Sequence, residues 1–410
     1  MRVLVFEPDF GGHHFDYLRL ILPAFSELAG SVVLSTTTAA LDSTQYQMLL
    51  KPLSCRVEID PLPSARGGLL LHSVQNARSL ARAVRRVRPD HVLVPYADGI
   101  SQVLGATRPW PMISRDVHLE GLMFRGGFAY PATSLRRRAF TFASWELATR
   151  ASWSRIHHLD PVVFEAIRRR GGAFASKCDL MPDPVERATP SDRVTARRRL
   201  AIPEDGRYVG CIGALDRRKG VDLLIRAFAR ASLEPSDRLL LVGPHEPHVS
   251  AMLCEEYAPL VRGGRIVSVD RFASPPDFEA AVQAADVICT PYPAHVGSAS
   301  IVIRGAAAGK FVLGSDWGWI GTTIRRFRLG RVCRVDDASE FASAIAASLA
   351  DAPSFSLGEA GRRFVAFHSP ENFVGCWTTY ARSRLGLPEA PGRRTWDWVL
   401  EALDARGAPS

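Results

Sequence analysis

The sequence lacks any long uncharged apolar run. A helix that crosses a bilayer needs about 20 consecutive apolar residues, and no stretch of this chain approaches that length. The first residues, MRVLVFEPDFGG, are typical of a short strand and a turn rather than of a signal peptide. We therefore expect a cytoplasmic protein. The 410 residues, of which 47% are hydrophobic and 23% charged, suffice for two globular domains.

Cysteine is scarce and irregularly spaced. The seven cysteines are odd in number, widely scattered and free of any CxxC pair, which argues against a disulfide framework and against a cysteine-rich zinc site. No DxD-like pair follows a predicted strand, and no Cys/His spacing resembles a metal motif. We expect buried, reduced thiols, no metal site and no bound cofactor. The cysteines are Cys55, Cys178, Cys211, Cys254, Cys289, Cys333 and Cys376.

Lysine occurs only four times, at Lys51, Lys177, Lys219 and Lys310, so arginine carries nearly all of the basic charge. The net charge of +9 favours an anionic partner. No basic motif interleaved with aromatic residues supports nucleic-acid binding. We therefore expect an anionic partner other than a nucleic acid.

Short apolar runs alternate with amphipathic stretches, which is the pattern of parallel βα units. It predicts an α/β protein with two Rossmann-like domains, residues 1–183 and 193–369, joined by the turn-rich segment Pro182–Asp192. A tail, 386–410, follows with one short helix, RTWDWVLEAL. Because parallel sheets bind ligands at the carboxyl ends of their strands, two such domains facing each other would form a cleft.

The strands that we expect are short and mostly β-branched or leucine-rich. In the first half they are Arg2–Phe6, Ser31–Ser35, Cys55–Ile59, His91–Pro95, Pro111–Ser114, Arg155–His158 and Asp179–Met181. In the second half they are Tyr208–Gly213, Arg238–Val242, Arg265–Val269, Val287–Thr290, Phe311–Gly314 and Gly330–Val335. Helices fill the gaps, most clearly at Ser73–Val87 and Leu135–Ala151.

Paired glycines follow the first strand, in Phe10–His14. The backbone at Gly12 allows a ligand to approach closely, and His13 and His14 would border the cleft. The pattern is not GxGxxG, and the second strand ends in VVLSTTT, without an acidic residue for a ribose hydroxyl. A nicotinamide dinucleotide is therefore not expected. A glycine turn of purely structural value stays an open alternative.

A second loop, Gly213–Gly220, has the sequence GALDRRKG and precedes the amphipathic stretch VDLLIRAFARA. It brings Arg217, Arg218 and Lys219 to a strand end, where clustered cations can neutralise a diphosphate. A solvated loop is the alternative reading for each of these side chains.

The third loop lies in Pro291–Asp316, which predicts a strand end, a glycine turn, a helix over 298–308 and a further strand. Free backbone N–H groups at Gly297 and Ser298, together with the helix dipole, favour a phosphate group. The segment therefore predicts a site for a phosphorylated ligand.

The order GALDRRKGVDLLIRAF, then LLLVGP, then DVICTPYPAHVGSASIVIRGAAAGKFVLGSDWGWI resembles the retaining, nucleotide-sugar-dependent glycosyltransferases of family 4, which have the GT-B fold. The resemblance covers nearly the whole chain. It implies a nucleoside-diphosphate sugar as donor substrate, no metal requirement, and a helix at 370–385 that braces the first domain. The residues that fit the family pattern are Gly213, Leu215, Lys219, Gly220, Gly309 and Val312.

The sequence also departs from this family at three positions. Ala214 stands where the family has an arginine, so Arg217 or Arg218 would supply that charge. Val296 and Arg304 stand where the family has the two glutamates of its Glu-x7-Glu motif, which contact the donor sugar and the ribose. Valine cannot bind a hydroxyl group, whereas Arg304 would face the nucleotide.

The resemblance places a histidine after the strand that we expect at Pro111–Ser114, and His118 matches it. It also implies an acceptor side, where His13, His14 and Asp116 would lie. Gly243 and Arg271, at two further strand ends, would join the donor site. The segment 121–145 mixes aromatic and arginine side chains. It fits either a peripheral membrane contact or an ordinary helix with a solvated basic face.

These observations predict a glycosyltransferase that moves a sugar from a nucleoside-diphosphate sugar to a hydroxyl acceptor with retention. Lys219 and Arg218 would stabilise the leaving diphosphate, and His118 would contact the sugar or the acceptor. Two alternatives stay open. One is a GT-B protein that binds a nucleotide sugar or a partner without turnover, because the motif glutamates are missing. The other, less favoured, is a Rossmann-type oxidoreductase or epimerase.

Overall fold

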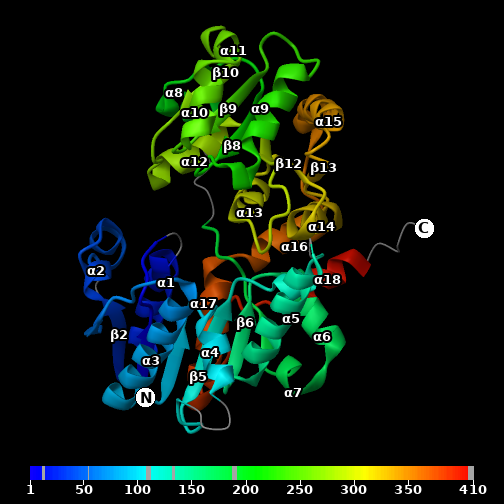
Figure 1. Cartoon of the computed structure of the whole chain (residues 1–410). Coiled ribbons are helices and arrows are strands. Elements are labelled where there is room, and N and C mark those ends of the chain that lie inside the picture. Colours follow the sequence, from blue (N-terminus) through cyan, green and yellow to red (C-terminus); the bar gives the residue numbers. More distant parts are fainter. Residues whose placement is uncertain (12–13, 54, 108–111, 132–133, 187–191, 405–410) are drawn as a thin grey trace. The chain divides into compact units, whose positions relative to one another are not determined.

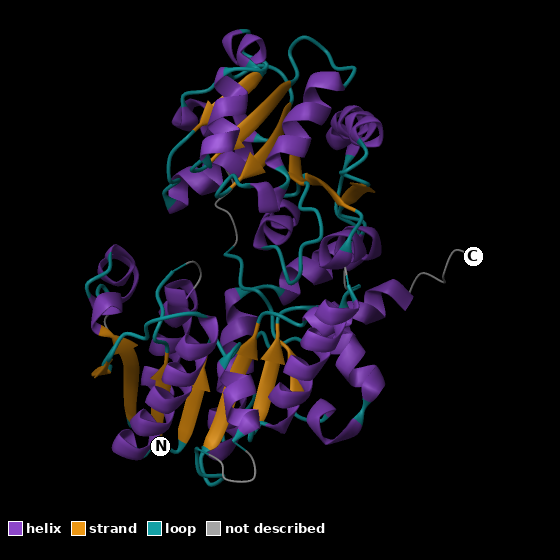
Figure 2. Ribbon diagram, viewed as in Figure 1, coloured by secondary structure: helices purple, strands orange, loops and turns teal. Residues whose placement is uncertain are grey.

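The computed structural model describes residues 1–11, 14–53, 55–107, 112–131, 134–186 and 192–404. The chain divides into two compact units (Figure 1). Unit 1 contains Met1–Pro184 and Pro370–Arg394, and unit 2 contains Val185–Ser369 and the residues from Thr395 onward. Each unit is built on its own parallel sheet with helices on both faces (Figure 2). The predicted α/β architecture with two Rossmann-like domains is confirmed.

The sheet of unit 1 has seven strands in the order β3-β2-β1-β4-β5-β6-β7, and every pair is parallel. Its strands are β1 (Arg2–Phe6), β2 (Ser31–Thr37), β3 (Glu58–Leu62), β4 (His91–Val94), β5 (His118–Met123), β6 (Arg155–His158) and β7 (Cys178–Leu180). Its helices are α1 (His14–Leu28), α2 (Thr38–Leu41), α3 (Leu69–Val87), α4 (Ile100–Ala106), α5 (Leu135–Arg150), α6 (Pro161–Arg170), α7 (Gly172–Ala175) and α17 (Pro370–Arg384).

The sheet of unit 2 has six strands in the order β10-β9-β8-β11-β12-β13, again all parallel. Its strands are β8 (Tyr208–Ile212), β9 (Arg238–Val242), β10 (Ile266–Val269), β11 (Val287–Thr290), β12 (Phe311–Ser315) and β13 (Gly330–Cys333). Its helices are α8 (Arg193–Leu200), α9 (Val221–Arg230), α10 (Pro247–Cys254), α11 (Ala258–Arg262), α12 (Pro275–Ala284), α13 (Ser300–Ala307), α14 (Gly318–Phe327), α15 (Ala338–Asp351), α16 (Glu359–Phe367) and α18 (Trp396–Asp404).

The helices form where apolar residues recur with helical spacing. In α9, the side chains of Val221, Leu224, Ile225 and Phe228 repeat at i, i+3, i+4 and i+7 and are all buried in the core of unit 2. This spacing gives the helix one apolar face, which packs on the sheet. The burial of such side chains contributes about 1.5–3 kcal/mol each.

The C-terminal part of the chain is shared between the two units. Helix α17 packs against α1 in unit 1, with the ring of Phe373 5.0 Å from that of Tyr17. Helix α18 instead packs against α16 in unit 2, where Trp396 contacts Phe367 at 5.2 Å between ring centroids. The tail expected at 386–410 is therefore divided at residues 394 and 395.

The fifth strand of unit 1 lies later in the sequence than we expected. Within the described residues no strand covers Pro111–Ser114, since Pro111 lies outside them and Ser114 accepts a turn hydrogen bond from Val117. The observed strand β5, HLEGLM, carries buried polar side chains that hide its strand character in the sequence. The third strand is likewise shifted, to Glu58–Leu62.

The lengths of the helices and the state of the cysteines can be compared with the expectations from the sequence. None of the described helices combines the length and the apolarity that a membrane crossing demands. All seven cysteines are free, as expected. They are not uniformly buried, because Cys254 is exposed and Cys55 is half-buried.

Candidate functional site

The loops at the carboxyl ends of β8, β9 and β10 are bound to one another through their backbones. Gly213 N–H donates to the carbonyl of Val242 at 2.8 Å, and Gly243 N–H donates to that of Val269 at 3.0 Å. Leu215 and His245 then form a parallel bridge beyond the strands. These bonds extend the sheet by one step and fix the start of each loop.

The close approach of the first two loops requires glycine at position 243. Its φ is +130°, and a Cβ atom there would lie 2.2 Å from the carbonyl oxygen of Gly213. No other residue type adopts this backbone without strain. The predicted donor-site glycines Gly213 and Gly243 are thus in direct contact.

Lys219 ends a short 3-10 turn, Arg217–Lys219, that is capped by Asp216. The Asp216 carboxylate accepts the backbone N–H of Lys219 at 2.8 Å. The Lys219 ammonium group turns back over the strand end, where it donates to the carbonyl of Ile212 at 3.3 Å and lies 5.6 Å from the ring centre of Tyr292. Burial lowers the pKa of Lys219. A half-buried cation at a strand end is suited to bind an anion.

The two neighbouring arginines are held less firmly. Arg217 and Arg218 are exposed, and Arg218 forms an ion pair of 3.4 Å with Asp216. Exposed pairs of this kind contribute little to stability, so Arg218 is free to exchange partners. The cluster predicted from the sequence is therefore present, with Lys219 as its ordered member.

The loop after β11 meets the Lys219 loop directly. Gly220 has a φ of +67°, and a Cβ atom there would lie 2.6 Å from the carbonyl oxygen of Pro291. The ring of His295 lies 5.4 Å from that of Tyr292, and its Nε2 is 3.1 Å from the Ser298 carbonyl. Burial, and then the positive charges of Arg218 and Lys219, lower the pKa of His295. The two loops thus form one site at the carboxyl ends of β8 and β11.

His295 was not predicted from the sequence. The signal that could have found it is its position in the glycine-containing loop PYPAHVGSAS. Gly297 is buried with a φ of +100°, and Ser298 follows it. Helix α13 begins at Ser300, two residues later than expected.

Arg304 and Arg271, which were also predicted for the donor site, both contact residues of α12. The guanidinium of Arg304 lies 5.4 Å from the ring centre of Phe278, in the first half of that helix. Arg271, after β10, forms an ion pair of 2.8 Å with Asp277. Next to it, Phe272 is 83% exposed. Both arginines are thus placed beside one helix start, and their contact with a nucleotide stays a prediction.

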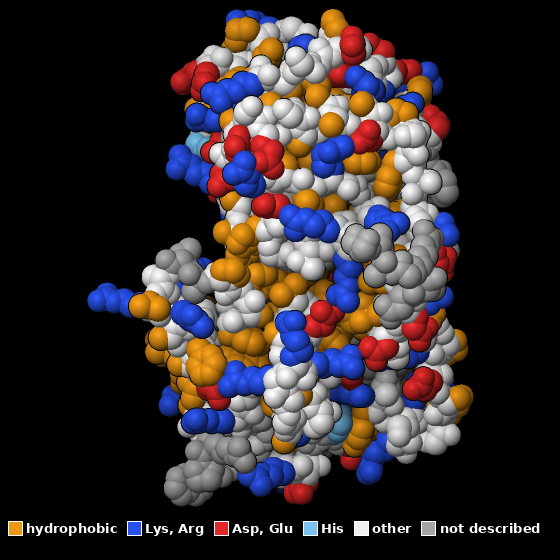
Figure 3. Space-filling view, turned by 90° about the vertical axis from the view of Figure 1, so that its right-hand side faces the viewer, with side chains coloured by type: hydrophobic (Ala, Val, Ile, Leu, Met, Phe, Trp, Pro, Cys, Tyr) orange, Lys and Arg blue, Asp and Glu red, His pale blue; other side chains and the backbone are white. Residues whose placement is uncertain are grey.

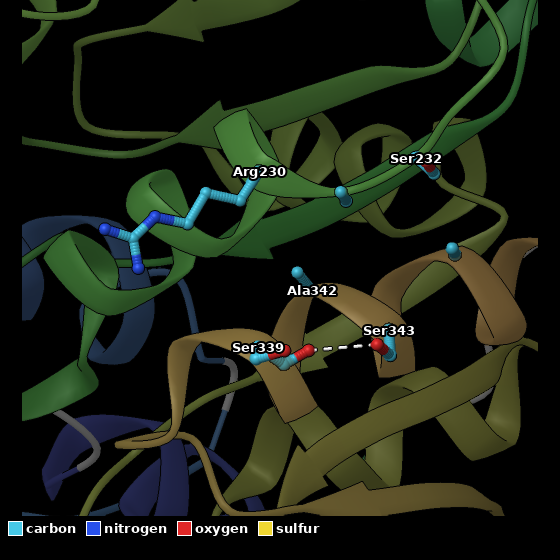
Figure 4. Close-up of a pocket in the computed structure, with 7 residues that line it drawn as sticks. Arg230, Ser232, Ser339, Ala342 and Ser343 are labelled. Atoms are coloured by element: carbon cyan, nitrogen blue, oxygen red, sulfur yellow. Dashed lines mark hydrogen bonds between the residues drawn. The ribbon is translucent and has the colours of Figure 1, made fainter.

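A separate pocket in unit 2 is lined by Arg230, Ser232, Ser339, Ala342 and Ser343 (Figure 4). It lies between the last residues of α9 and the first turns of α15. Because α9 runs back from the carboxyl end of β8, this pocket is at the opposite end of the helix from Lys219. Because the pocket lies away from the Lys219 loop, we assign it no role in the site.

Unit 1 holds a second cluster at the carboxyl ends of its strands. Glu7, directly after β1, is buried and forms an ion pair of 2.9 Å with His14 at the start of α1. Burial raises the pKa of Glu7. Burial lowers the pKa of His14, but the charge and hydrogen bond of Glu7, together with the charge of Asp9, outweigh it, so the pKa of His14 is raised overall. The ring of Tyr96, after β4, lies 4.7 Å from that of His14. Of the predicted acceptor-side residues, His14 is therefore placed at a strand end, in a pair that the sequence did not reveal.

Asp98, which follows β4, also lies at this end of the unit 1 sheet. Its carboxylate accepts the backbone N–H groups of Phe124 and Arg125, at 2.8 and 3.1 Å, and so links the loop after β4 to the loop after β5. Burial raises the pKa of Asp98 to about 6. The predicted residues Gly12 and His13 lie outside the described residues.

The predicted placement of His118 and Asp116 at the carboxyl end of a strand is wrong. His118 is the first residue of β5, so it lies at the amino end of the strand, opposite to the end where parallel sheets bind ligands. Its ring is stacked on Tyr380 of α17, with 3.4 Å between centroids. Asp116 is exposed in the turn before the strand and accepts a hydrogen bond from Ser114. The error follows from the misplaced fifth strand.

The basic side chains form no single large patch on the face drawn in Figure 3, where Lys and Arg are interspersed with acidic and hydrophobic side chains. The described residues include many arginine–carboxylate ion pairs, such as Arg207 with Asp237 at 2.8 Å. Many of the basic side chains are thus paired with carboxylates of the same unit.

Comparison with known proteins connects these sites to a family. Residues 206–351, which include the Lys219 and His295 loops, match the family model described as Glycosyl transferases group 1. D-inositol 3-phosphate glycosyltransferase of Geodermatophilus obscurus is 29% identical over 253 residues, or 58% of this chain and 56% of that protein. The corresponding protein of Corynebacterium aurimucosum is 32% identical over 181 residues, or 42% of each chain. The chain thus spans about half the length of the curated relatives it matches.

Solved structures resemble the chain over almost its full length. Sucrose-phosphate synthase from Thermosynechococcus elongatus gives a TM-score of 0.69 at 19% identity, covering 94% of this chain and 99% of that one. HepE of Anabaena, in complex with UDP and glucose, gives 0.65 at 16% identity, covering 94% and 100%. The likeness establishes a shared fold. The chain therefore has the fold of these glycosyltransferase structures, and residues 206–351 of its unit 2 match the family described as Glycosyl transferases group 1.

Proposed function

We propose that the protein transfers a sugar from a nucleoside-diphosphate sugar to a hydroxyl group of an acceptor, with retention of configuration at the anomeric carbon. The observation that carries the proposal is the convergence of Lys219, Arg218 and His295 at the carboxyl ends of β8 and β11. The HepE structure, which is bound to UDP and glucose, supports a nucleotide sugar as donor.

The chemical demand of such a transfer falls on the leaving group. The bond between the anomeric carbon and the β-phosphate oxygen breaks, and negative charge develops on the diphosphate. In our proposal the ammonium of Lys219 and the guanidinium of Arg218 stabilise this charge, with backbone N–H groups near Gly297 and Ser298. The Lys219 ammonium is positioned before the reaction, because Asp216 caps its turn and the ring of Tyr292 lies beside it.

Val296 and Arg304 bear on the choice of donor. Val296 is half-buried in the loop before α13 and offers no polar atom to a sugar hydroxyl. Arg304 contacts Phe278 and retains donors for a phosphate or carboxylate group. We therefore propose that the sugar is held mainly by backbone groups of this loop, and that the donor differs from one recognised through two carboxylates.

Unit 1 is proposed to hold the acceptor. The Glu7–His14 pair offers a proton acceptor at a strand end, next to the ring of Tyr96. A histidine whose partner is a buried carboxylate can take a proton from a hydroxyl as that hydroxyl attacks. The acceptor is proposed only by class, as a hydroxyl group of a glycan, a lipid-linked molecule or a small molecule.

A peripheral contact with an anionic membrane through 121–145 also belongs to the proposal. At the start of α5, Leu135, Phe140 and Phe142 are 82%, 72% and 47% exposed, and Arg136–Arg138 are exposed beside them. Apolar side chains flanked by arginines bind anionic bilayers. Sedimentation with phosphatidylglycerol vesicles tests it, because the combined variant Phe140→Ser with Phe142→Ser should lose vesicle binding that the native chain shows.

The transfer is tested by incubating the purified chain with a series of UDP-, GDP- and ADP-sugars and measuring the release of the nucleoside diphosphate. We expect release from at least one donor, and its loss in Lys219→Ala. A donor that binds without any release, with or without acceptors, would favour the non-catalytic alternative. A chain that neither binds nor cleaves any donor would refute the proposal.

A further inference from the structure

Four polar side chains gather at the amino ends of three neighbouring strands in unit 1. They are His91 at the start of β4, His118 and Glu120 in β5, and His157 in β6. The strand register pairs His91 with His118 and Leu122 with His157. Because side chains alternate along a strand, all four project from the same face of the sheet.

Glu120 lies at the centre of this cluster. One carboxylate oxygen, Oε2, is 2.9 Å from His91 Nε2 and 3.8 Å from His118 Nε2. The other, Oε1, is 2.6 Å from His157 Nε2. His91, Glu120 and His157 are each 1% exposed or less.

Aromatic side chains of α17 cover the cluster. Tyr380 lies flat on His118 and edge-on to His91, with ring centroids 3.4 and 4.9 Å apart. Trp377 lies 5.2 Å from His157. The side chain of His118 retains 17% exposure, whereas those of His91 and Glu120 are fully buried.

The hydrogen bonds within the cluster do not satisfy His118. Its Nε2 is buried, has no hydrogen-bond partner in the structure and points to the same carboxylate oxygen as His91 Nε2. One ligand atom from each of His91, His118 and Glu120 lies within 4.8 Å of the other two. Four ligands around zinc at about 2.0 Å stand about 3.3 Å apart, so small side-chain shifts would bring the three atoms to that spacing.

We propose that His91, His118 and Glu120 form a zinc-binding site. Two imidazole nitrogens and one carboxylate oxygen are a ligand set that Zn²⁺ prefers, and a solvent molecule on the side of His118 would complete the tetrahedron. His157 holds the second oxygen of Glu120 and so orients the carboxylate, as outer-shell partners of metal ligands do. Zinc takes the place of the hydrogen on His91 Nε2, and the imidazole carries its remaining proton on Nδ1.

The site is independent of the proposed sugar transfer. It lies at the amino ends of the strands, whereas Glu7, His14 and Asp98 lie at the carboxyl ends of the same sheet. Its role is therefore structural. The bound metal would link β4, through His91, to β5, through His118 and Glu120. The residues of α17 that cover the site come from a distant part of the sequence.

The test measures zinc in the full-length chain, purified without a histidine tag, stripped with a chelator and returned to Zn²⁺. We expect one equivalent of zinc per chain by elemental analysis and a rise in melting temperature on addition of Zn²⁺. In His118→Gln and in Glu120→Gln the affinity, measured by competition with a chromophoric chelator, should fall by about 100-fold or more. His72→Gln is the matched control, because it removes a histidine that pairs with Asp9 outside the cluster.

Cobalt substitution keeps the test decisive if a variant does not fold. Co²⁺ bound to the native chain should give the visible absorption of tetrahedral coordination, and Zn²⁺ should displace it. Absence of this absorption, less than a tenth of an equivalent of zinc, or equal affinity in native chain and His118→Gln would each overturn the proposal and leave a hydrogen-bonded core cluster.

Discussion

The replacement of Lys219 by methionine separates nucleotide binding from stability. Methionine keeps the length of the aliphatic part and removes the ammonium group. We expect Lys219→Met to bind nucleoside diphosphates more weakly than the native chain while it unfolds at the same or a higher temperature. The physical reason is that the same charge is favourable to a bound phosphate and unfavourable to the folded protein without one.

The expected size of the binding effect follows from the contacts. A hydrogen bond to a charged group contributes about 1.5–3 kcal/mol, so the dissociation constant should rise by about 10- to 150-fold. The effect on stability is small. Burial lowers the pKa of Lys219, which means that the charged form is disfavoured in the folded state. Relief of that cost offsets the loss of one long hydrogen bond, of 3.3 Å, to Ile212, so the free energy of unfolding should change by about 1 kcal/mol or less.

The measurement combines isothermal titration calorimetry with UDP, GDP and ADP and thermal unfolding without ligand. Lys310→Met is the matched control, because Lys310 is also a half-buried lysine of unit 2 and donates to the carbonyl of Gln283 at 2.8 Å. Burial lowers its pKa to about 8, but it lies at the amino end of β12. Equal loss of binding in both variants, or unchanged binding in Lys219→Met, would refute the assigned role of Lys219.

Three further predictions concern the loops and the buried acids. In Gly243→Ala the new Cβ would lie 2.2 Å from the carbonyl oxygen of Gly213, so the two loops could not keep their contact. We expect a lower melting temperature and a lower nucleotide affinity. Normal nucleotide binding in this variant would contradict the loop geometry. Asp216→Ala should weaken nucleotide binding and cost about 1 kcal/mol of unfolding free energy by removing the cap of the Arg217–Lys219 turn, which calorimetry and denaturant titration can check. Asp160 is buried, and burial raises its pKa to about 6 from 3.8. The folded state therefore holds this proton more tightly, and the contribution of Asp160 to stability should fall as the pH rises from about 4 to about 6. Asp160→Asn, whose Oδ1 can still accept from Val162 and whose amide N–H can donate to the Tyr130 oxygen, should remove that slope in melting curves, and an unchanged slope would contradict the assignment.

The sequence located most strands because their signal is local. Runs such as RVLVF and RLLLV are apolar throughout and are bounded by turns, so β1 and β9 begin and end where we predicted. The strand β5 was missed because His118 and Glu120 interrupt its apolar pattern. His91 precedes its neighbour His118 by 27 residues, and His157 follows its partner Glu120 by 37 residues. Only the parallel register of the strands brings these side chains together. A single misplaced strand then moved His118 from one end of the sheet to the other in the prediction.

The sequence by itself determined the two βα halves, the loop with Lys219 and the glycine turn before α13, since each of these depends on residues that are close along the chain. Only the tertiary structure decided which loops meet. It placed His295 beside Lys219, paired Glu7 with His14, turned Arg304 toward Phe278 and gathered three histidines around Glu120. These contacts depend on strand order and register, which are set by packing over the whole of each unit and leave no mark in any short segment.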